Sequence, residues 1–149
     1  MIEQLLDLTN YATKTRVARR KTGKKTNEFF TPYSIVKRMC DKIPDSDWSD
    51  PKKTFLESSF GNGQFVVYIV WNRIQHGIDW ETALKTLGGV ELMADNVKET
   101  KERVIDLLDK MNITYDKETA MEIMNKNLVC ADFFKWDFEH WKYIDDKKR

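Results

Sequence analysis

Apolar residues recur along this chain with two different spacings, which predict short strands separated by helices. Runs of apolar residues at 54–56, 88–92 and 128–131 are typical of strands. Apolar residues at helical spacing predict helices over 65–76, 96–111 and 117–124, and Asp79 is expected to cap a short helix that reaches Leu84. Strands that alternate with helices favour parallel pairing and right-handed crossovers.

The segment before the first strand predicts a helix followed by a loop. Thr31 can cap a helix through its hydroxyl, and Pro32 suits the first helical position, so we expect a helix over 32–43. Its inward-facing residues are expected to be Ile35, Val36, Met39 and Ile43. Residues 44–53 contain two prolines and several polar residues, and they are expected to form a loop.

Residues 1–26 are set apart from the rest by their charge pattern, and we treat them as a separate N-terminal helix and basic arm. Residues 2–20 predict an amphipathic helix. The end of this segment is cationic and contains no acid: Lys14, Arg16, Arg19, Arg20, Lys21, Lys24 and Lys25. Two interpretations stay open, a solvated helix end or a contact with nucleic-acid phosphates or an acidic partner.

Length and composition suit one cytosolic domain. The chain has 149 residues, a formal net charge of +1 and two widely separated cysteines in no metal-ligand spacing, so we expect no metal site. No apolar run approaches the roughly 20 residues that span a bilayer, and no signal peptide is evident at the N-terminus. We therefore expect a cytoplasmic protein without a membrane partner.

The stretch 54–70 combines the first strand, a glycine-containing turn and the next helix. Gly61 and Gly63 permit positive φ and close backbone approach, and the free N–H groups of the following helix point toward the carboxyl end of the strand. This order of elements is suited to holding a cofactor. The turn does not match G-x-G-x-x-G, and no P-loop lysine follows it.

Acidic residues end all three predicted strands: Glu57, Glu91 and Asp132. Because the carboxyl ends of parallel strands lie along one edge, the three carboxylates are expected to meet at one crevice. The first can accept from a cationic amino group, the second from ribose hydroxyls and the third from an adenine amine, with Leu92 and Phe133 beside the ring. The alternative is that each acid only caps the helix that follows it.

Four segments in this order, NEFFTP, FLESSFGNGQF, GVEL and VCADFF, resemble the cofactor-binding half of the N6-adenine DNA methyltransferases of restriction-modification systems. The resemblance spans residues 27–134. It implies an α/β fold, a truncated doubly wound, Rossmann-like parallel sheet of the class I methyltransferase type with N-terminal helices, and a cofactor-binding domain over 27–149. It also implies S-adenosylmethionine as cofactor, bound by Phe30, Thr31, Glu57, Ser58, Gly61, Gly63, Glu91, Leu92, Asp132 and Phe133.

The sequence departs from this family in its catalytic part. Glu57 and Ser58 replace the usual Asp and Pro, which preserves the hydrogen-bonding logic. The catalytic Asn/Asp-Pro-Pro-aromatic loop has no counterpart, since all three prolines lie at or before Pro51. We therefore assign no catalytic residue, and expect a domain that binds the cofactor but is not a self-sufficient methylase.

Two other functions remain open at this point. The chain could be an enzyme that acts on DNA adenine or on S-adenosylmethionine itself, or a DNA-binding or partner-binding protein with a vestigial pocket.

The resemblance also bears on partners. In the family's strand order the first strand would lie beside a fourth strand that has no match here, which leaves it an exposed apolar edge. A second copy, another subunit or the aromatic segment 133–143 is expected to cover it, with oligomerisation favoured. Trp136, Trp141 and Tyr143 fit either a cover for the sheet or a surface that stacks on bases.

Overall fold

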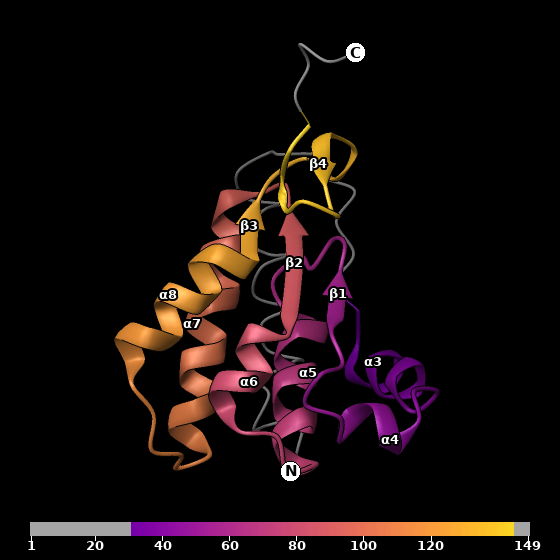
Figure 1. Cartoon of the computed structure of the whole chain (residues 1–149), viewed down its shortest axis with the longest axis vertical. Helices are drawn as coiled ribbons and strands as arrows, with labels where there is room; N and C mark the ends of the chain where they lie inside the picture. The colour runs from indigo at the N-terminus through magenta and orange to yellow at the C-terminus, as the bar shows by residue number, and fades with distance from the viewer. Residues whose placement is uncertain (1–30, 145–149) are drawn as a thin grey trace.

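The computed structural model describes residues 31–144, which form a parallel sheet with helices packed around it (Figure 1). Strands β1 (Phe55–Glu57), β2 (Leu87–Glu91) and β3 (Leu128–Cys130) pair in the order β1-β2-β3, and both pairings are parallel. All three strands point toward the end of the molecule that carries the C-terminal hairpin (Figure 1). The α/β class and the predicted parallel pairing are confirmed.

Helices make both crossovers between these strands. Helices α5 (Gln64–Gln75) and α6 (Trp80–Lys85) connect β1 to β2, and helices α7 (Ala94–Lys110) and α8 (Lys117–Asn127) connect β2 to β3. Helices α5 and α7 contact each other, α5 contacts β1, and α7 contacts β2 and β3. The four predicted helices of this region are confirmed, although α7 begins two residues earlier and α8 ends three residues later than expected.

The hydrophobic core lies between the sheet and the α5/α7 pair. Strand register places Phe55, Leu87 and Leu128 on one face of the sheet, where Leu87 and Leu128 are buried. Val66, Val70, Val104 and Leu108 of the two helices are completely buried in the same cluster. Burial of these side chains is the main force that holds the helices on the sheet.

Local sequence signals set the ends of the connecting helices. The Asp79 carboxylate accepts a hydrogen bond from the Thr82 N–H at 3.0 Å, as expected for a helix cap. Helix α5 ends at Gln75, and Gly77 then takes a positive φ of 87°. A residue with a Cβ is strained in that conformation, which explains the glycine after this helix.

The predicted helix over 32–43 is wrong at both ends. Helix α3 (Tyr33–Cys40) has Pro32 itself as an extended N-cap, and Thr31 supplies no side-chain cap. Of the four residues expected to face inward, Val36 is buried and Ile43 packs against the core, while Ile35 and Met39 are 38% and 54% exposed. Since α3 packs on α5, a narrow stripe suffices to bury it.

The predicted loop over 44–53 contains a short helix, α4 (Asp45–Trp48). Trp48 is 2% exposed and stacks on the ring of Phe55, with centroids 4.8 Å apart. The polar residues and prolines around Trp48 are typical of a loop, so the composition of the segment did not predict this helix. The stacked Trp48 side chain anchors the segment to β1.

The aromatic segment after β3 folds back onto the sheet. It forms the 3₁₀ turn η1 (Phe133–Lys135) and an antiparallel hairpin of β4 (Trp136–Asp137) and β5 (Lys142–Tyr143). The Trp141 indole lies against Gly88 on the sheet face opposite the core, and its N–H donates to the Lys126 carbonyl at 2.7 Å. Trp141 thus acts as cover for β2, whereas Tyr143 remains 56% exposed.

The hairpin does not pair with β1, which is an edge strand within residues 31–144. Leu56 of this strand, on the sheet face opposite Phe55 and Leu87, is 56% exposed. A cavity of about 300 Å³ separates β1 from the hairpin, with Thr54, Leu56, Phe138 and Trp141 among its lining residues.

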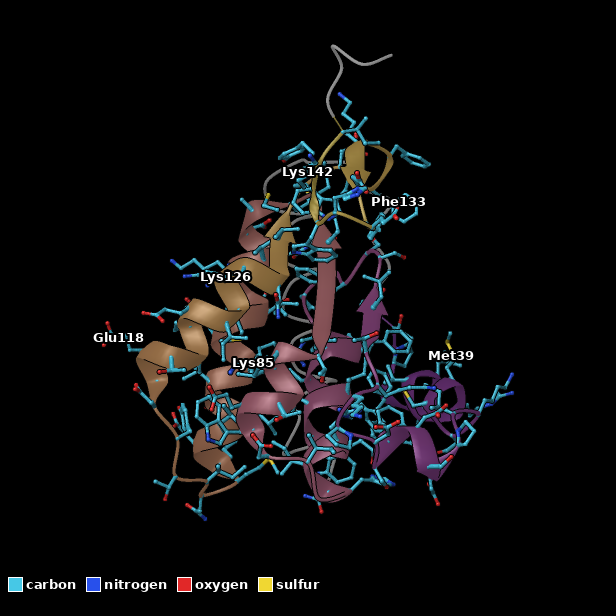
Figure 2. All side chains as sticks on the ribbon, viewed as in Figure 1. Met39, Lys85, Glu118, Lys126, Phe133 and Lys142 are labelled. Carbon is cyan, nitrogen blue, oxygen red and sulfur yellow. The ribbon has the colours of Figure 1, made fainter. Side chains whose placement is uncertain are left out.

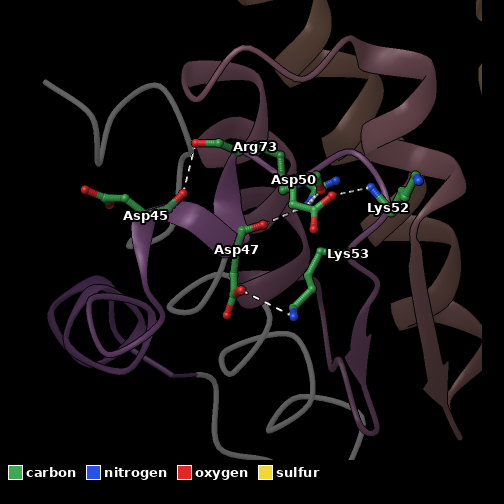
Figure 3. A network of polar contacts seen from close by, with 7 residues as sticks. Asp45, Asp47, Asp50, Lys52, Lys53 and Arg73 are labelled. Atoms are coloured by element: carbon green, nitrogen blue, oxygen red, sulfur yellow. Dashed lines mark hydrogen bonds and ion pairs between the residues drawn. The ribbon is translucent and has the colours of Figure 1, made fainter.

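A buried arginine joins α5 to the segment before β1 (Figure 3). Arg73 is fully buried, and its guanidinium donates to the carbonyls of Asp47 and Asp50 at 3.4 and 3.1 Å and to the Thr86 hydroxyl at 3.3 Å. It also lies over the Phe55 ring at 4.9 Å. Burial lowers the pKa of Arg73, and the nearby Asp50 charge opposes that shift.

Replacement of Arg73 should therefore destabilise the fold. We expect Arg73→Ala to lower the free energy of unfolding by about 2–4 kcal/mol, because it leaves a cavity and removes the donors of three part-buried acceptors. Lys53→Ala is the matched control, since Lys53 pairs with Asp47 at 3.3 Å at the half-exposed surface and should cost less than about 1 kcal/mol. Urea unfolding of both variants checks this, and equal losses would contradict it.

Candidate functional site

The glycine turn between β1 and α5 has the backbone conformation that the sequence suggested. Gly61 and Gly63 have positive φ values of 55° and 99°, and Gly63 is the N-cap of α5. The Gly63 N–H donates to the Phe60 carbonyl at 2.9 Å, which closes the turn. Main-chain N–H groups at the start of α5 are therefore presented at the carboxyl end of β1.

Two side chains of helix α7 donate hydrogen bonds to the carbonyls of this turn. The Thr100 hydroxyl donates to the Gly61 carbonyl at 3.3 Å, and the Arg103 guanidinium donates to the Asn62 carbonyl at 2.7 Å. Thr100 and Arg103 are 0% and 3% exposed. A Cβ on Gly63 would lie 2.8 Å from Thr100 Cγ2, so glycine is required there for packing as well as for φ. The turn is thus held in one conformation by buried contacts.

Glu91 joins the turn to the end of β2. One carboxylate oxygen accepts from the Gly61 N–H at 3.2 Å, and the other accepts from the Met93 N–H at 2.8 Å and the Asn96 amide at 3.2 Å. The side chain is 6% exposed. Met93 is the N-cap residue of α7, so Glu91 ties the start of α7 to the turn rather than capping the N–H groups of the helix itself.

The three strand-end acids lie on the same face of the sheet. In the strand register Glu57 lies beside Gly89, and Glu91 lies beside Cys130. Because side chains alternate between the two faces along a strand, Glu57, Glu91 and Asp132 lie on the same face. Each acid is two residues further toward the carboxyl end of the sheet than the one before it. Each acid also accepts a hydrogen bond from the backbone N–H two residues later, at 3.2, 2.8 and 3.0 Å respectively. The sheet thus carries the three acids on one face at the carboxyl ends of its strands, and that they share one crevice stays a prediction.

Glu57 has an unfavourable electrostatic environment. Burial raises the pKa of the Glu57 carboxyl, and the hydrogen bond from the Ser59 N–H only partly opposes this. Within residues 31–144 no ion pair involves Glu57. A half-buried carboxylate without a cation beside it would be stabilised by a cationic ligand.

A hydrogen-bond chain brings the Thr-Pro element to the turn. The Gln64 side chain donates to the Thr31 carbonyl at 2.9 Å, and it accepts from the Arg103 guanidinium at 2.8 Å. Thr31 therefore lies beside the start of α5 although it is 33 residues away in sequence. This contact, rather than helix capping, is what positions Thr31.

The remaining candidate residues differ in exposure. Leu92 and Phe133 are 64% and 45% exposed, and Ser58 is partly buried. Phe133 lies near the hairpin at the end to which the strands point (Figure 2), and its ring contacts Phe134 edge-on at 5.2 Å. Phe30 and the cationic residues Arg16, Arg19, Arg20, Lys21, Lys24 and Lys25 lie outside the described residues.

Sequence reasoning missed the buried polar residues behind the turn. Asn62, Gln64, Thr100 and Arg103 are all at most 3% exposed. Both amide atoms of Asn62 lack a hydrogen-bond partner in the described part of the chain. A position between two turn glycines could have suggested a role for Asn62, whereas nothing in the pattern of the long α7 distinguishes Thr100 or Arg103 from surface residues.

Residues 31–144 contain no cluster of three or more metal-ligating side chains and no helix long and apolar enough to cross a membrane. Cys40 is buried and Cys130 is exposed, and both are free thiols. No protein-family model matches the chain, and comparisons with curated proteins and with solved structures found no significant match.

Two glycines separate the effect of φ from the effect of packing. Gly63→Ala introduces both an unfavourable φ and a clash with Thr100, whereas Gly77→Ala has a similar φ but nothing within 4 Å of the new Cβ. We expect Gly77→Ala to lower the free energy of unfolding by about 1–2 kcal/mol, and Gly63→Ala to lower it by roughly 1–3 kcal/mol more. Thermal unfolding checks this. Adding Thr100→Ala to Gly63→Ala should recover part of the lost stability, because it removes the clash. Equal losses of stability in Gly63→Ala and Gly77→Ala would disprove the packing role of Gly63.

Proposed function

We propose that this chain binds S-adenosylmethionine at the carboxyl ends of β1, β2 and β3, in a fold of the class I methyltransferase type. The observation that carries the proposal is the position of Glu57, Glu91 and Asp132 on one sheet face, at the strand ends beside a positive-φ glycine turn. Parallel α/β sheets bind nucleotide ligands at this edge. The resemblance of the sequence to adenine methyltransferases selects this cofactor among nucleotides.

The chemistry of each group fits one part of this ligand. Glu57, whose carboxylate has no cation beside it in residues 31–144, would pair with the ammonium group. Glu91 accepts only one hydrogen bond on the oxygen that faces Gly61, which leaves capacity for a ribose hydroxyl. Asp132 uses one oxygen for the Phe134 N–H, so its other oxygen could accept from the adenine amine.

Other groups would enclose the ligand. The exposed side chains of Leu92 and Phe133 offer apolar contact to the two sides of the adenine ring. Gly61 and Gly63 allow the main chain to approach the methionine part, where Ser58, Thr31 and Phe30 complete the site. The N-terminus of α5 would favour the ligand carboxylate.

When bound, the cofactor would supply an electrophilic methyl group. We propose that the chain does not transfer this group to DNA by itself, because no Asn/Asp-Pro-Pro-aromatic segment is present in its 149 residues to accept from an adenine amine and stack on a flipped base. Its own residues would bind and orient the ligand, and another polypeptide would complete the catalytic site.

Calorimetric titration tests the proposal. We expect the protein to bind S-adenosylmethionine and S-adenosylhomocysteine but not ATP. Glu57→Gln should lower the affinity for S-adenosylmethionine about tenfold or more, since a charged hydrogen bond is lost. Because burial raises the pKa of Glu57, affinity should fall as pH drops through that raised pKa, and Glu57→Gln should remove this dependence. Glu122→Gln, at an exposed glutamate of α8, controls for the lost charge.

Stability of the same variant gives a second readout. The raised pKa means that the folded state disfavours ionised Glu57, so this carboxyl destabilises the protein above its ordinary pKa, and the penalty vanishes below it. Glu57→Gln should therefore raise the unfolding temperature at neutral pH but not in acid. Absence of heat at millimolar S-adenosylmethionine, or equal affinity for ATP, would overturn the proposed function.

We further propose that a second copy of the chain covers the β1 edge. The Phe55 N–H donates to the Thr86 carbonyl, so β1 directs the main-chain groups of Phe55 and Glu57 to β2 and those of Leu56 away from the sheet. An open strand edge with a half-exposed leucine is prone to pair with another strand. Within residues 31–144 nothing pairs with that edge.

Light scattering after gel filtration measures this association. We expect the native chain to be a dimer or larger and Leu56→Glu to shift it to a monomer, because a buried charge opposes pairing at the edge. Lys126→Glu is the control, since Lys126 is exposed on α8, on the other side of the sheet from β1 in Figure 2. A monomeric native chain would refute self-association and leave a different subunit as the partner to seek.

A further inference from the structure

The sheet face opposite the core is only partly covered. Strand register puts Leu56, Gly88, Val90 and Val129 on this face. Val90 is buried there, whereas Leu56 on β1 is 56% exposed. Parallel sheets normally have both faces covered, because their strands carry apolar side chains on both sides. The part of this face over β1 therefore needs a further apolar cover.

A groove marks this part of the face. It is the cavity of about 300 Å³ between β1 and the hairpin, and its lining includes Leu56 and Gly88 from the sheet and Phe138 and Trp141 from the hairpin. Trp141 reaches the sheet in a left-handed backbone conformation with a φ of 53°, which is unfavourable for a residue with a Cβ. The hairpin thus covers β2 through a strained residue and leaves the groove open over β1.

The segment before the described residues has a sequence pattern that fits this groove. The amphipathic helix predicted over 2–20 has Ile2, Leu5, Leu6 and Leu8 within its first two turns. As a helix it would be about 28 Å long, several times the spacing of about 5 Å between neighbouring strands. Its apolar side is therefore long enough to cross the groove.

The connection to this segment can reach the groove without crossing another described element. The Thr31 carbonyl is held by Gln64 at the start of α5, the helix that follows β1. Within residues 31–144 β1 is an edge strand, so a path from Thr31 to the far face passes round that edge. Residues 21–30 span up to about 33 Å when extended, well above the roughly 10 Å between packed layers.

We propose that the N-terminal helix of residues 2–20 packs into this groove of the same chain, with its apolar side around Leu5 and Leu6 against Leu56 and Trp141. The tether formed by residues 21–30 holds the helix near the groove at an effective concentration of the order of millimolar. This favours the chain's own helix over that of a second copy.

The docked helix is compatible with the candidate site and with pairing at the β1 edge. Glu57, Glu91 and Asp132 lie on the opposite face of the sheet, so the helix leaves them open. The Leu56 side chain points to the groove, whereas its main-chain groups lie in the plane of the sheet. The helix therefore buries the side chain and leaves the strand edge free.

Amide hydrogen exchange of the full chain, measured by mass spectrometry, tests this docking. We expect peptides over 2–20 to be protected. Leu5→Glu should speed exchange about tenfold or more in these peptides and in those over 136–143, because a charge on the apolar side opposes burial. Asn10→Glu is the matched control, since Asn10 lies away from that side of the predicted helix and should leave exchange unchanged.

A second variant and an internal reference complete the experiment. Leu56→Ser removes the apolar contact from the sheet side and should also speed exchange over 2–20, which keeps the test open should Leu5→Glu not fold. Peptides of α7 keep their protection in any folded variant, which separates undocking from unfolding. No ligand is used, so the result does not depend on the proposed function.

Three results would overturn the proposal. The first is rapid exchange over 2–20 in the native chain, and the second is an equal effect of Leu5→Glu and Asn10→Glu. The third is a loss of protection over 2–20 on roughly hundredfold dilution, since only docking between chains depends on protein concentration. That last result would make a second copy the source of the helix.

Discussion

The rest of the structure depends on the hydrogen bonds that hold the glycine turn between β1 and α5. Arg103 and Thr100 of α7 bond its carbonyls, and Glu91 at the end of β2 bonds its Gly61 N–H. These contacts join both crossovers of the sheet at one point. Since all three side chains are nearly inaccessible to water, each bond forms in a low-dielectric setting, where leaving it unmade is costly.

This arrangement separates groups that hold the protein together from groups with unused capacity. Both carboxylate oxygens of Glu91 bond the turn or the start of α7, with acceptor capacity left only on the oxygen that faces Gly61, whereas Glu57 bonds only the Ser59 N–H and Asp132 bonds only main-chain groups next to it. Glu57 is therefore costly to the fold, because burial disfavours its charge. Such a cost is typical of groups kept for binding rather than for stability.

Local patterns predicted those elements whose signals lie within a few residues. The Asp79 cap, the end of α5 near Gly77 and the acids after each strand all follow from short-range chemistry. Prediction failed where a distant contact decided the outcome. Trp48 orders a proline-rich segment by stacking on Phe55, and Thr31 serves Gln64 rather than the helix next to it.

The sequence by itself determined the order of strands and helices, the positive-φ turn and the residue type at each strand end, because these depend on backbone preference and on neighbours along the chain. Only the tertiary structure decided that three acids share one face, that Arg103 and Gln64 connect the turn to Thr31, and that Asn62 lacks a partner. Those properties arise from strand register and from side chains that meet across tens of residues. A one-residue shift in register would have moved Glu57 to the opposite face.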